Sequence, residues 1–238
     1  MSSVMKSNPG FENRFLAALP REEYAHLAPY LETVRLQQNK ALYEADGNIR
    51  YAYFLKGGMA SLISVTEDGD GIEVGMIGNE GVIGIPAIFG IKVSPYRVVI
   101  QLPANAMRIQ AWVLRAEFNR SVQFRDLVLR REHMLLTQIS QSAACNRYHS
   151  MRERLCRWLL ISYDRVHADH LDLTQEFLAQ MIGAPRTRVT VVANLLQKSG
   201  LIRYRRGKIQ ILDRRGLEAA SCECYRVVKS QITHLIAA

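Results

Sequence analysis

The chain has 238 residues, of which 48% are hydrophobic and 22% are charged, and these proportions are normal for a globular protein of one large or two ordinary domains. Its net charge of +9 is uneven, because residues 1–149 carry 16 basic against 14 acidic side chains and residues 150–238 carry 15 against 8. This excess favours a polyanionic partner for the C-terminal part. A merely soluble basic surface, an acidic protein or an anionic membrane fits the charge equally well.

Residues 1–10 lack the apolar core of a signal peptide, and the longest apolar run, 82–91, is too short and too rich in glycine to span a bilayer. We therefore expect a cytoplasmic protein with no membrane partner. The four cysteines are too few for a disulfide framework, and Cys222-Glu-Cys224 lacks the spacing and the second pair of a zinc ribbon. We interpret all four as ordinary thiols and expect no metal and no cofactor, with redox or metal chemistry as the alternative.

Residues 11–31 have the pattern of two short helices separated at Pro20. From residue 34 to about 109 the pattern changes to short β-type segments, at 41–43, 51–55, 60–65, 72–77, 98–102 and 107–109. Turn signals separate them at 46–47, 57–58, 68–71, 78–79 and 103–105. Short strands at this spacing predict a sandwich or barrel, with a jelly roll as the natural candidate. The expected fold class is thus α+β, with an N-terminal jelly-roll β-barrel.

Some jelly rolls are metal enzymes that use clustered histidines, so an enzyme is the main rival interpretation. The predicted β region contains no histidine, since His26 precedes it and His133 follows it. The ligand set of a cupin-type metal site is therefore missing, and we expect no catalytic residues.

Residues 115–149 contain no glycine or proline and predict one long helix. Phe124, Val128, Leu135, Ile139 and Ser142 lie near a common stripe. One face is expected to cover the barrel while another meets the same helix of a second subunit, which would make the protein a homodimer. A helix that packs only within its own chain is the alternative.

Residues 174–200 have the pattern of a helix-turn-helix. Thr174 can cap a first helix, and Glu176 suits the positive end of its dipole. Gly183 permits positive φ where that helix ends, and Pro185 fits the start of a second helix. A helical hairpin beside a solvated charge cluster is the alternative interpretation.

In the second helix, apolar residues at 189, 192, 193 and 196 fall on one side, and the other side is exposed to a partner. We expect this exposed side to read bases in the major groove, where arginine can take guanine in a two-pronged contact and valine can meet a thymine methyl. The candidate base-reading residues are Arg186, Thr187, Thr190, Val191 and Asn194.

Residues 201–206 and 208–212 predict two strands around Gly207, which would form a wing beside the helix pair. A final helix is expected from 214 to 235, capped by Asp213. Basic and hydroxyl side chains of the helix pair and the wing are expected to contact phosphate. These are Thr174, Arg188, Lys198, Arg203, Arg205, Arg206 and Lys208.

A β-roll, a long connecting helix and a C-terminal winged helix, in this order, resemble the Crp/Fnr family of bacterial transcription regulators. The most specific parts of the resemblance are Leu173-Thr174-Gln175-Glu176 through Ile182-Gly183, then Arg186 to Leu196 and Gly200-Leu201-Ile202. It implies that Arg186, Thr187 and Thr190 occupy base-reading positions. Val191 stands where the cyclic-AMP receptor branch carries another arginine, which implies a different operator half-site.

The resemblance also implies an effector pocket near Gly78, Gly84, Ile85, Tyr96 and Arg97. Cyclic-nucleotide members of the family hold the phosphate with a Gly-Glu-Leu turn and an Arg-Ser pair, because a buried phosphodiester needs a cation and the ribose needs an acceptor. Here Ile83-Gly84-Ile85-Pro86 lacks the glutamate, and Tyr96-Arg97 stands near the Arg-Ser position. We expect a degenerate sensor that does not bind cyclic AMP. Either another, less anionic ligand or a filled barrel without a ligand is consistent with the sequence.

These observations predict a sequence-specific DNA-binding transcription regulator. It would act as a homodimer on a palindromic operator in double-stranded DNA, with RNA polymerase as a partner if it is an activator and an effector not specified by the sequence. We expect residues 1–149 to form the sensor with its connecting helix and residues 150–238 to form the winged helix-turn-helix domain. The rival is a ligand-binding or enzymatic barrel whose C-terminal helices serve protein contacts.

Overall fold

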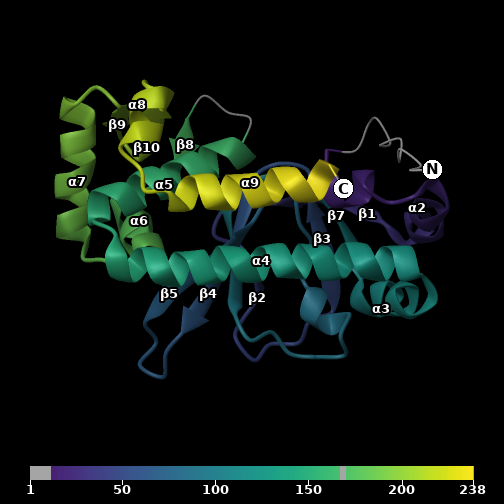
Figure 1. The fold of residues 1–238 in the computed structure, drawn as a ribbon. Helices are drawn as coiled ribbons and strands as arrows, with labels where there is room; N and C mark the ends of the chain where they lie inside the picture. The colour runs from purple at the N-terminus through teal and green to yellow at the C-terminus, as the bar shows by residue number, and fades with distance from the viewer. Residues whose placement is uncertain (1–11, 167–169, 238) are drawn as a thin grey trace.

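A computed structural model describes residues 12–166 and 170–237, with side chains to residue 232. Phe11, the expected start of the first helical pair, lies outside these residues. Figure 1 shows an elongated molecule in which one long helix, α4, runs past a β-roll to a cluster of small helices and strands at the far end. None of the helices in the described part of the chain is long and apolar enough to cross a bilayer.

The N-terminal part combines two short helices, a β-roll and two further helices. Its helices are α1 (Arg14–Ala17), α2 (Arg21–Leu27), α3 (Ala111–Arg120) and α4 (Val122–Tyr148), with single 3₁₀ turns η1 (Ala28–Tyr30) and η2 (Ile85–Ala87). Its strands are β1 (Glu32–Leu36), β2 (Ala41–Tyr43), β3 (Tyr51–Leu55), β4 (Met59–Val65), β5 (Gly71–Ile77), β6 (Arg97–Leu102) and β7 (Ala104–Gln110).

The C-terminal part contains five helices and a small sheet in the described residues. Its elements are α5 (Met151–Arg165), β8 (Leu171–Asp172), α6 (Gln175–Ile182), α7 (Arg186–Lys198), β9 (Ile202–Arg205), β10 (Lys208–Ile211), α8 (Arg214–Ala219) and α9 (Cys224–Ala237). All sheets in the described chain are antiparallel, so the predicted mixed α+β class is confirmed.

The seven N-terminal strands form two sheets, with strand orders β1-β7-β3 and β2-β6-β4-β5. Buried side chains of both sheets, among them Leu36, Leu55, Leu62 and Ile100, pack into one core. No strand pair joins the two sheets within the described residues, so the predicted barrel is an open two-sheet jelly roll rather than a closed one. The short β-type segments and the turns between them were sufficient to predict most of these strands, although β4 and β6 are almost continuously buried and do not alternate.

Two strand predictions were wrong. The first strand, β1, was missed because Leu36 is its one buried residue, so it lacks the alternation that marks a half-buried strand. The expected turn at 103–105 is also wrong: Pro103 alone separates β6 from β7, and Ala104 pairs with Leu36 in the sheet.

The long helix predicted over 115–149 is two helices. The chain turns at Ser121, whose side chain accepts a hydrogen bond from the Phe124 amide (3.1 Å) and donates one to Glu23 (2.8 Å). A serine cap with a tertiary partner therefore ends α3 and starts α4 where no glycine or proline marks the sequence. Phe124 and Val128 of the predicted stripe are buried against the roll.

The helix predicted over 214–235 is likewise two helices, α8 and α9, separated at residues 220–223. Asp213 caps α8 as expected, by accepting from the Gly216 amide. The predicted wing strands are confirmed as β9 and β10, but β8, which pairs with β10, was missed because it has only two residues.

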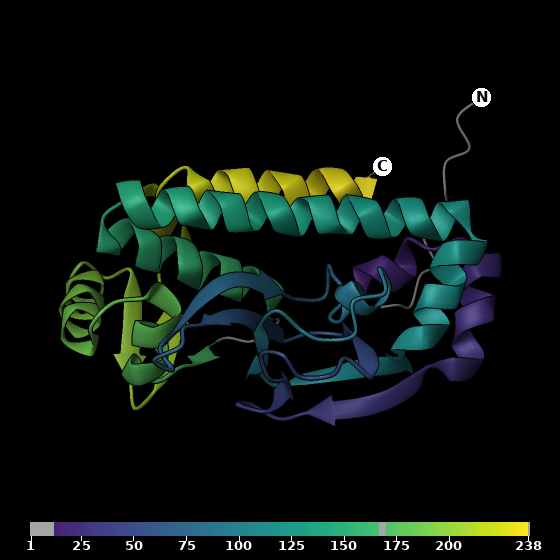
Figure 2. The same cartoon turned by 90° about the horizontal axis from the view of Figure 1, so that it is seen from below.

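Figures 1 and 2 agree that α9 lies beside α4, and the two helices run in opposite directions. Helix α5 docks the C-terminal part on the roll through two buried carboxylates. Trp158 donates its indole N–H to Glu73 (2.8 Å), and Arg165 binds Glu80 through Nε (3.0 Å) and Nη2 (2.7 Å). These contacts orient α5 on the roll by charge-assisted bonds as well as by apolar packing.

Candidate nucleic-acid interface

The helix pair α6–α7 has the geometry that the sequence predicted. Thr174 caps α6 by accepting from the Phe177 amide (3.2 Å), and Gly183 ends the helix in the left-handed region, at φ 63°. Pro185 directly precedes α7. From α5, the Arg154 guanidinium donates to the Ile182 carbonyl, so a cation holds the negative end of α6 at the corner.

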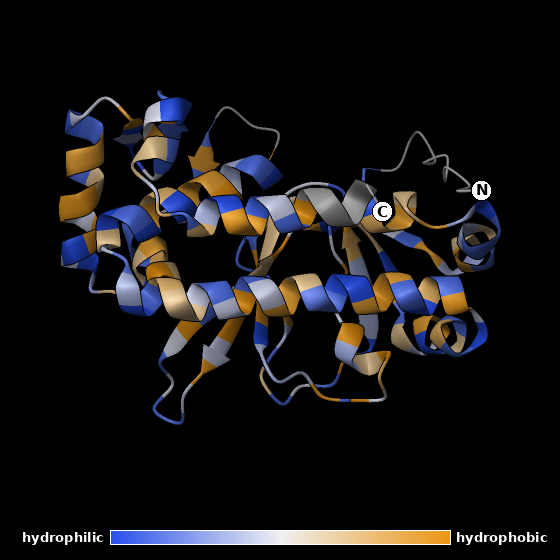
Figure 3. Cartoon of the chain, in the orientation of Figure 1, coloured by the Kyte–Doolittle hydropathy of each residue, from blue (hydrophilic) through white to orange (hydrophobic). Residues whose placement is uncertain are grey.

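One face of α7 is packed and the opposite face is free. Val189, Ala193 and Leu196 are buried in the core beneath the helix, with Val192 half-buried beside them. Figure 3 shows hydrophobic residues through the middle of α7 and hydrophilic residues at both of its ends. The apolar spacing in the sequence therefore placed the packed face correctly.

The candidate base-reading residues differ in their exposure to solvent. The exposed ones are Arg186, Thr187, Val191 and Asn194. The Arg186 side chain is 63% exposed and lies 3.6 Å from the Glu176 carboxylate, whose side chain is 78% exposed. An ion pair this exposed is weak, so a phosphate or base could displace it. Thr190 is half-buried, and its hydroxyl is within 2.9 Å of both Gln175 Oε1 and the Arg186 carbonyl. Thr190 thus links α7 to α6 as well as facing the reading side.

The wing is a tight antiparallel hairpin joined by Arg206 and Gly207, whose φ values of 51° and 76° are both positive. Such a two-residue turn matches the twist of the strands it joins. The side chains of Arg203, Arg205, Arg206 and Lys208 are all exposed. Lys208 lies 3.6 Å from Asp172 of β8, whereas no carboxylate pairs with the three arginines in the described part of the chain.

The remaining expected phosphate contacts, Thr174, Arg188 and Lys198, are exposed as well. Thr174 caps α6, and Arg188 and Lys198 belong to α7. The helix pair and the wing thus bring every predicted DNA-contacting residue into one end of the molecule, visible at the left of Figure 1.

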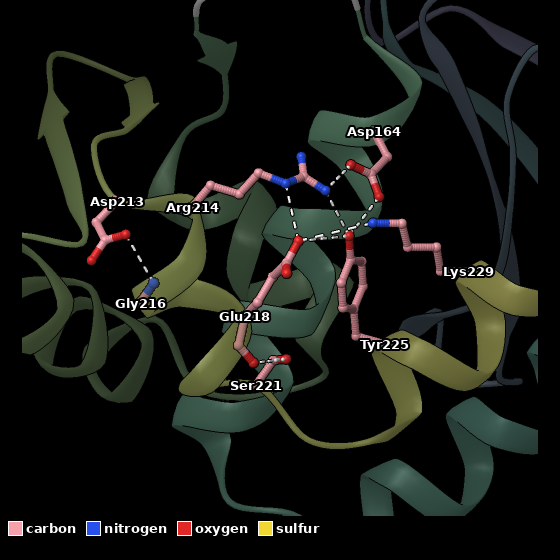
Figure 4. Close-up of polar contacts among 8 residues, drawn as sticks. All are labelled: Asp164, Asp213, Arg214, Gly216, Glu218, Ser221, Tyr225 and Lys229. Atoms are coloured by element: carbon pink, nitrogen blue, oxygen red, sulfur yellow. Dashed lines mark hydrogen bonds and ion pairs between the residues drawn. The ribbon is translucent and has the colours of Figure 1, made fainter.

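A polar network holds this end together. Figure 4 shows Arg214 of α8 between Asp164 of α5 (2.6 Å), Glu218 (3.0 Å) and the hydroxyl of Tyr225 in α9 (2.7 Å). Tyr225 also donates to Asp164 (2.8 Å), and burial raises the pKa of this phenol above its ordinary value. The network fixes α5, α8 and α9 relative to one another.

A cavity of about 180 Å³ lies between the roll and α4. Three of the five candidate pocket residues, Gly84, Ile85 and Tyr96, line it. The remaining walls are mainly aliphatic, and Glu132 is the one charged residue among the lining side chains that the structure describes. Burial raises the pKa of the Glu132 carboxyl.

The other two candidate pocket residues lie elsewhere. Arg97 points outward and pairs with Glu44 at 3.1 Å, and Gly78 lies under the Arg165 side chain. Arg131 of α4 is buried and its guanidinium has no hydrogen-bond partner in the described chain, but it lines a separate cavity of about 20 Å³. That cavity has room for little more than one water molecule and cannot hold a nucleotide.

The fold also brings together Cys145, His149, Cys222 and Cys224. From the sequence, the three cysteines were interpreted as ordinary thiols. The available signal was the spacing of Cys145 and His149, which at i, i+4 places both on one face of a helix end. The second pair lies much later in the chain, at the start of another helix, and nothing in the sequence indicated that the two helix ends meet.

The described chain thus joins a winged helix-turn-helix, whose second helix has one exposed face, to a β-roll and a long helix. Residues 153–220 match the family model of the Crp-like helix-turn-helix domain. None of the curated protein sequences matches the chain.

Solved structures resemble most of the chain. A CRP family transcriptional regulator from Thermus thermophilus is 19% identical at a TM-score of 0.67, with 79% of this chain and 96% of that chain covered. FixK2 from Bradyrhizobium japonicum is 14% identical at a TM-score of 0.69, with 81% and 98% covered. The c-di-GMP responsive regulator CLP from Xanthomonas campestris is 16% identical at a TM-score of 0.66, with 82% and 100% covered.

Residues 153–220 are therefore a Crp-like helix-turn-helix domain, and the chain has the fold of the Crp/Fnr family of transcription regulators.

Proposed function

We propose that the protein is a sequence-specific transcription regulator that binds a palindromic operator as a homodimer in the bacterial cytoplasm. The observation that carries the proposal is the exposed face of α7 beside three unpaired wing arginines, on the part of the chain that holds most of the net positive charge. Residues 1–149 would form the sensor and dimerisation part, and residues 150–238 the DNA-binding part. RNA polymerase would be a further partner if the protein activates transcription.

In this proposal α7 enters the major groove. Arg186, Thr187, Val191 and Asn194 read base edges, while Thr190 acts both as a reader and as a brace to Gln175. The wing arginines and Lys208, together with Thr174, Arg188 and Lys198, contact phosphate and set the register of the domain on the duplex.

The outer face of α4 supports the homodimer. Val122, Leu129 and Leu136 are 59%, 48% and 61% exposed, and they recur every seven residues along a helix whose other face packs on the roll and on α9. Leu136 also borders the cavity between the roll and α4. A seven-residue apolar repeat is the pattern of a helix pair that buries one seam against its partner. Two copies joined along this seam would present two recognition helices to the two half-sites of a palindrome.

The cavity supports a sensor that does not bind cyclic nucleotides. A buried phosphodiester needs a cation, and Arg97 is directed away from the cavity toward Glu44. A carboxylate, Glu132, stands in the wall instead. An uncharged or weakly basic small molecule of mainly apolar surface fits these walls better than any nucleotide.

The DNA-binding function is tested by selection of bound fragments from genomic DNA, followed by fluorescence anisotropy on the selected site. Arg186→Ala should reduce the free energy of binding to that site by about 1 to 3 kcal/mol and relax base preference at one position. Arg205→Ala should weaken selected and random DNA alike and lower the salt slope by about one. Arg50→Ala, which removes an exposed arginine from the roll, is the matched control and should change neither value.

Recovery of a palindrome would support the proposal. No enrichment over random DNA, with or without cell extract, would contradict it and favour a ligand-binding or enzymatic roll whose C-terminal helices bind another protein.

The dimer is tested by sedimentation of the Leu129→Glu/Leu136→Glu variant, which should shift toward monomer because two charges enter the seam. Wild-type protein that sediments as a monomer at all concentrations would refute this part. The sensor is tested by calorimetric titration with cyclic AMP and cyclic GMP at millimolar concentration. Saturable heat together with tighter operator binding would overturn the assignment of the cavity.

A further inference from the structure

Three thiols and an imidazole converge where the end of α4 meets the start of α9. Cys145 and His149 come from the end of α4, and Cys222 and Cys224 precede and open α9. The candidate ligand atoms of all four lie within 4.8 Å of one another. Cys145 Sγ is 3.5 Å from Cys222 Sγ, and Cys224 Sγ is 3.5 Å from His149 Nδ1.

The two 3.5 Å separations match those of ligands around a single tetrahedral ion, and the full set, within 4.8 Å, is somewhat wider. Sulfur at about 2.3 Å and nitrogen at about 2.0 Å from zinc, placed at the corners of a tetrahedron, are about 3.5 to 3.8 Å apart. A multi-iron cluster is a poorer fit, because each thiolate would bind a different iron and the sulfurs would stand farther apart.

The surroundings match those of metal ligands rather than those of packed thiols. The three cysteines are buried and form a cluster with no aliphatic member, while the His149 side chain is 16% exposed. Gln141 donates its amide N–H to Cys224 Sγ (3.1 Å). The Glu223 carboxylate lies 3.2 Å from His149 Nε2, so it can hold the proton there and leave Nδ1 free to face the thiols.

A cation also lies near the cluster. The buried Arg157 guanidinium of α5 donates to the hydroxyl of Ser142 (3.3 Å), three residues before Cys145 in α4. Three thiolates and a neutral imidazole around a divalent cation would carry one net negative charge, which the buried Arg157 can offset.

We propose that Cys145, His149, Cys222 and Cys224 form a closed zinc site of the Cys₃His type. With four protein ligands and no open position, the ion would be structural rather than catalytic. This inference goes beyond the proposed DNA-binding function and does not depend on it.

The site would tie together the two chain segments that flank the helix pair and the wing. Residues 150–221, which include the helix pair and the wing, lie between the two ligand pairs in the chain. A bound ion would therefore close this segment into a loop at its base and fix α9 against α4.

The test uses the full chain, without an affinity tag, purified under reducing conditions. Zinc measured by plasma mass spectrometry should be about one ion per chain. After removal of zinc with a chelator, Co²⁺ should bind with the same stoichiometry and give the strong visible bands and thiolate charge-transfer bands of a tetrahedral sulfur-rich site. Cys224→Ser should lose these bands, and Glu223→Gln should weaken metal binding about 10- to 100-fold.

Cys156→Ser is the matched control, because Cys156 is a buried cysteine outside the cluster. It should keep the full metal content. If the ligand variants do not fold, the wild-type chain still decides: chelation should lower its melting temperature, and one equivalent of ZnCl₂ should restore it.

Folded wild-type protein that takes up neither Zn²⁺ nor Co²⁺ would overturn the proposal. So would a Cys145–Cys222 disulfide found in place of the metal, or equal metal loss in the Cys156→Ser control.

Discussion

Replacement of Glu73 by glutamine removes an ionisable group from the contact between the roll and the C-terminal part. The Glu73 carboxyl of β5 is buried and accepts hydrogen bonds from Ser61, Gln101 (2.8 Å) and the indole of Trp158 in α5 (2.8 Å). Burial raises its pKa from the ordinary 4.5 to about 7, and the hydrogen bonds and the charge of Arg157 offset only part of this effect.

The raised pKa makes folding stability depend on pH. Between pH 4.5 and 7 the folded chain keeps a proton on Glu73 that the unfolded chain has lost. The stabilisation is therefore complete below pH 4.5 and is lost as pH rises through about 7. The loss of unfolding free energy over the whole pH range is about 3 kcal/mol, and about 2.5 kcal/mol of it occurs between pH 5 and pH 8.5.

The glutamine variant should fold and lose this dependence. Its carbonyl can accept from Trp158, and its amide can donate to Ser61 or to the Gln101 carbonyl oxygen, which has no partner among the described residues. Relative to the variant, the wild type should lose about 2.5 kcal/mol of unfolding free energy from pH 5 to pH 8.5.

Urea unfolding at fixed protein concentration, followed by tryptophan fluorescence, measures this difference. Trp158 is 1% exposed and Trp112 is 60% exposed, so the emission shift on unfolding reports mainly on the contact with Glu73. Glu67→Gln, which removes an exposed carboxyl from the β4–β5 loop, controls for the loss of one negative charge. Parallel wild-type and Glu73→Gln curves across this range would refute the reasoning.

Three further predictions concern single positions. Gly183→Ala should cost about 1 to 2 kcal/mol in urea unfolding, because the residue has positive φ and its new methyl would meet Ile72 of the roll at 2.5 Å; an unchanged midpoint would contradict this. Ser121→Ala should cost about 1 kcal/mol in the same assay through loss of the α4 cap, and an equal effect of Ser230→Ala would show that the cap is not the cause. Arg206→Gly should weaken binding to random DNA while stabilising the fold slightly, since glycine tolerates the positive φ of the wing turn; a lower melting temperature would show otherwise.

The elements of the helix-turn-helix could be predicted from the sequence because their signals are local. The Thr174 cap, the left-handed Gly183 and the apolar spacing through Leu196 each depend on residues within one or two helical turns. The change of period from two to 3.6 residues likewise separated the roll from the helices without knowledge of any contact.

The wrong helix boundary and the missed strand both had a tertiary cause. Ser121 begins α4 partly through its hydrogen bond to Glu23, a residue 98 positions earlier. Strand β1 pairs with β7 although its own sequence carries little alternation. The cavity walls also needed the structure, since Arg97 stands near the expected pocket in sequence but pairs with Glu44 on the outside.

The sequence by itself determined the order of the elements and the two faces of α7, because helix and strand periodicity are properties of neighbouring residues. Only the tertiary structure decided which distant side chains meet. The antiparallel packing of α9 on α4 brings Cys222 and Cys224 to Cys145 and His149, and the docking of α5 places Trp158 on Glu73. Such contacts depend on how whole helices pack against one another, and no local sequence pattern specifies that packing.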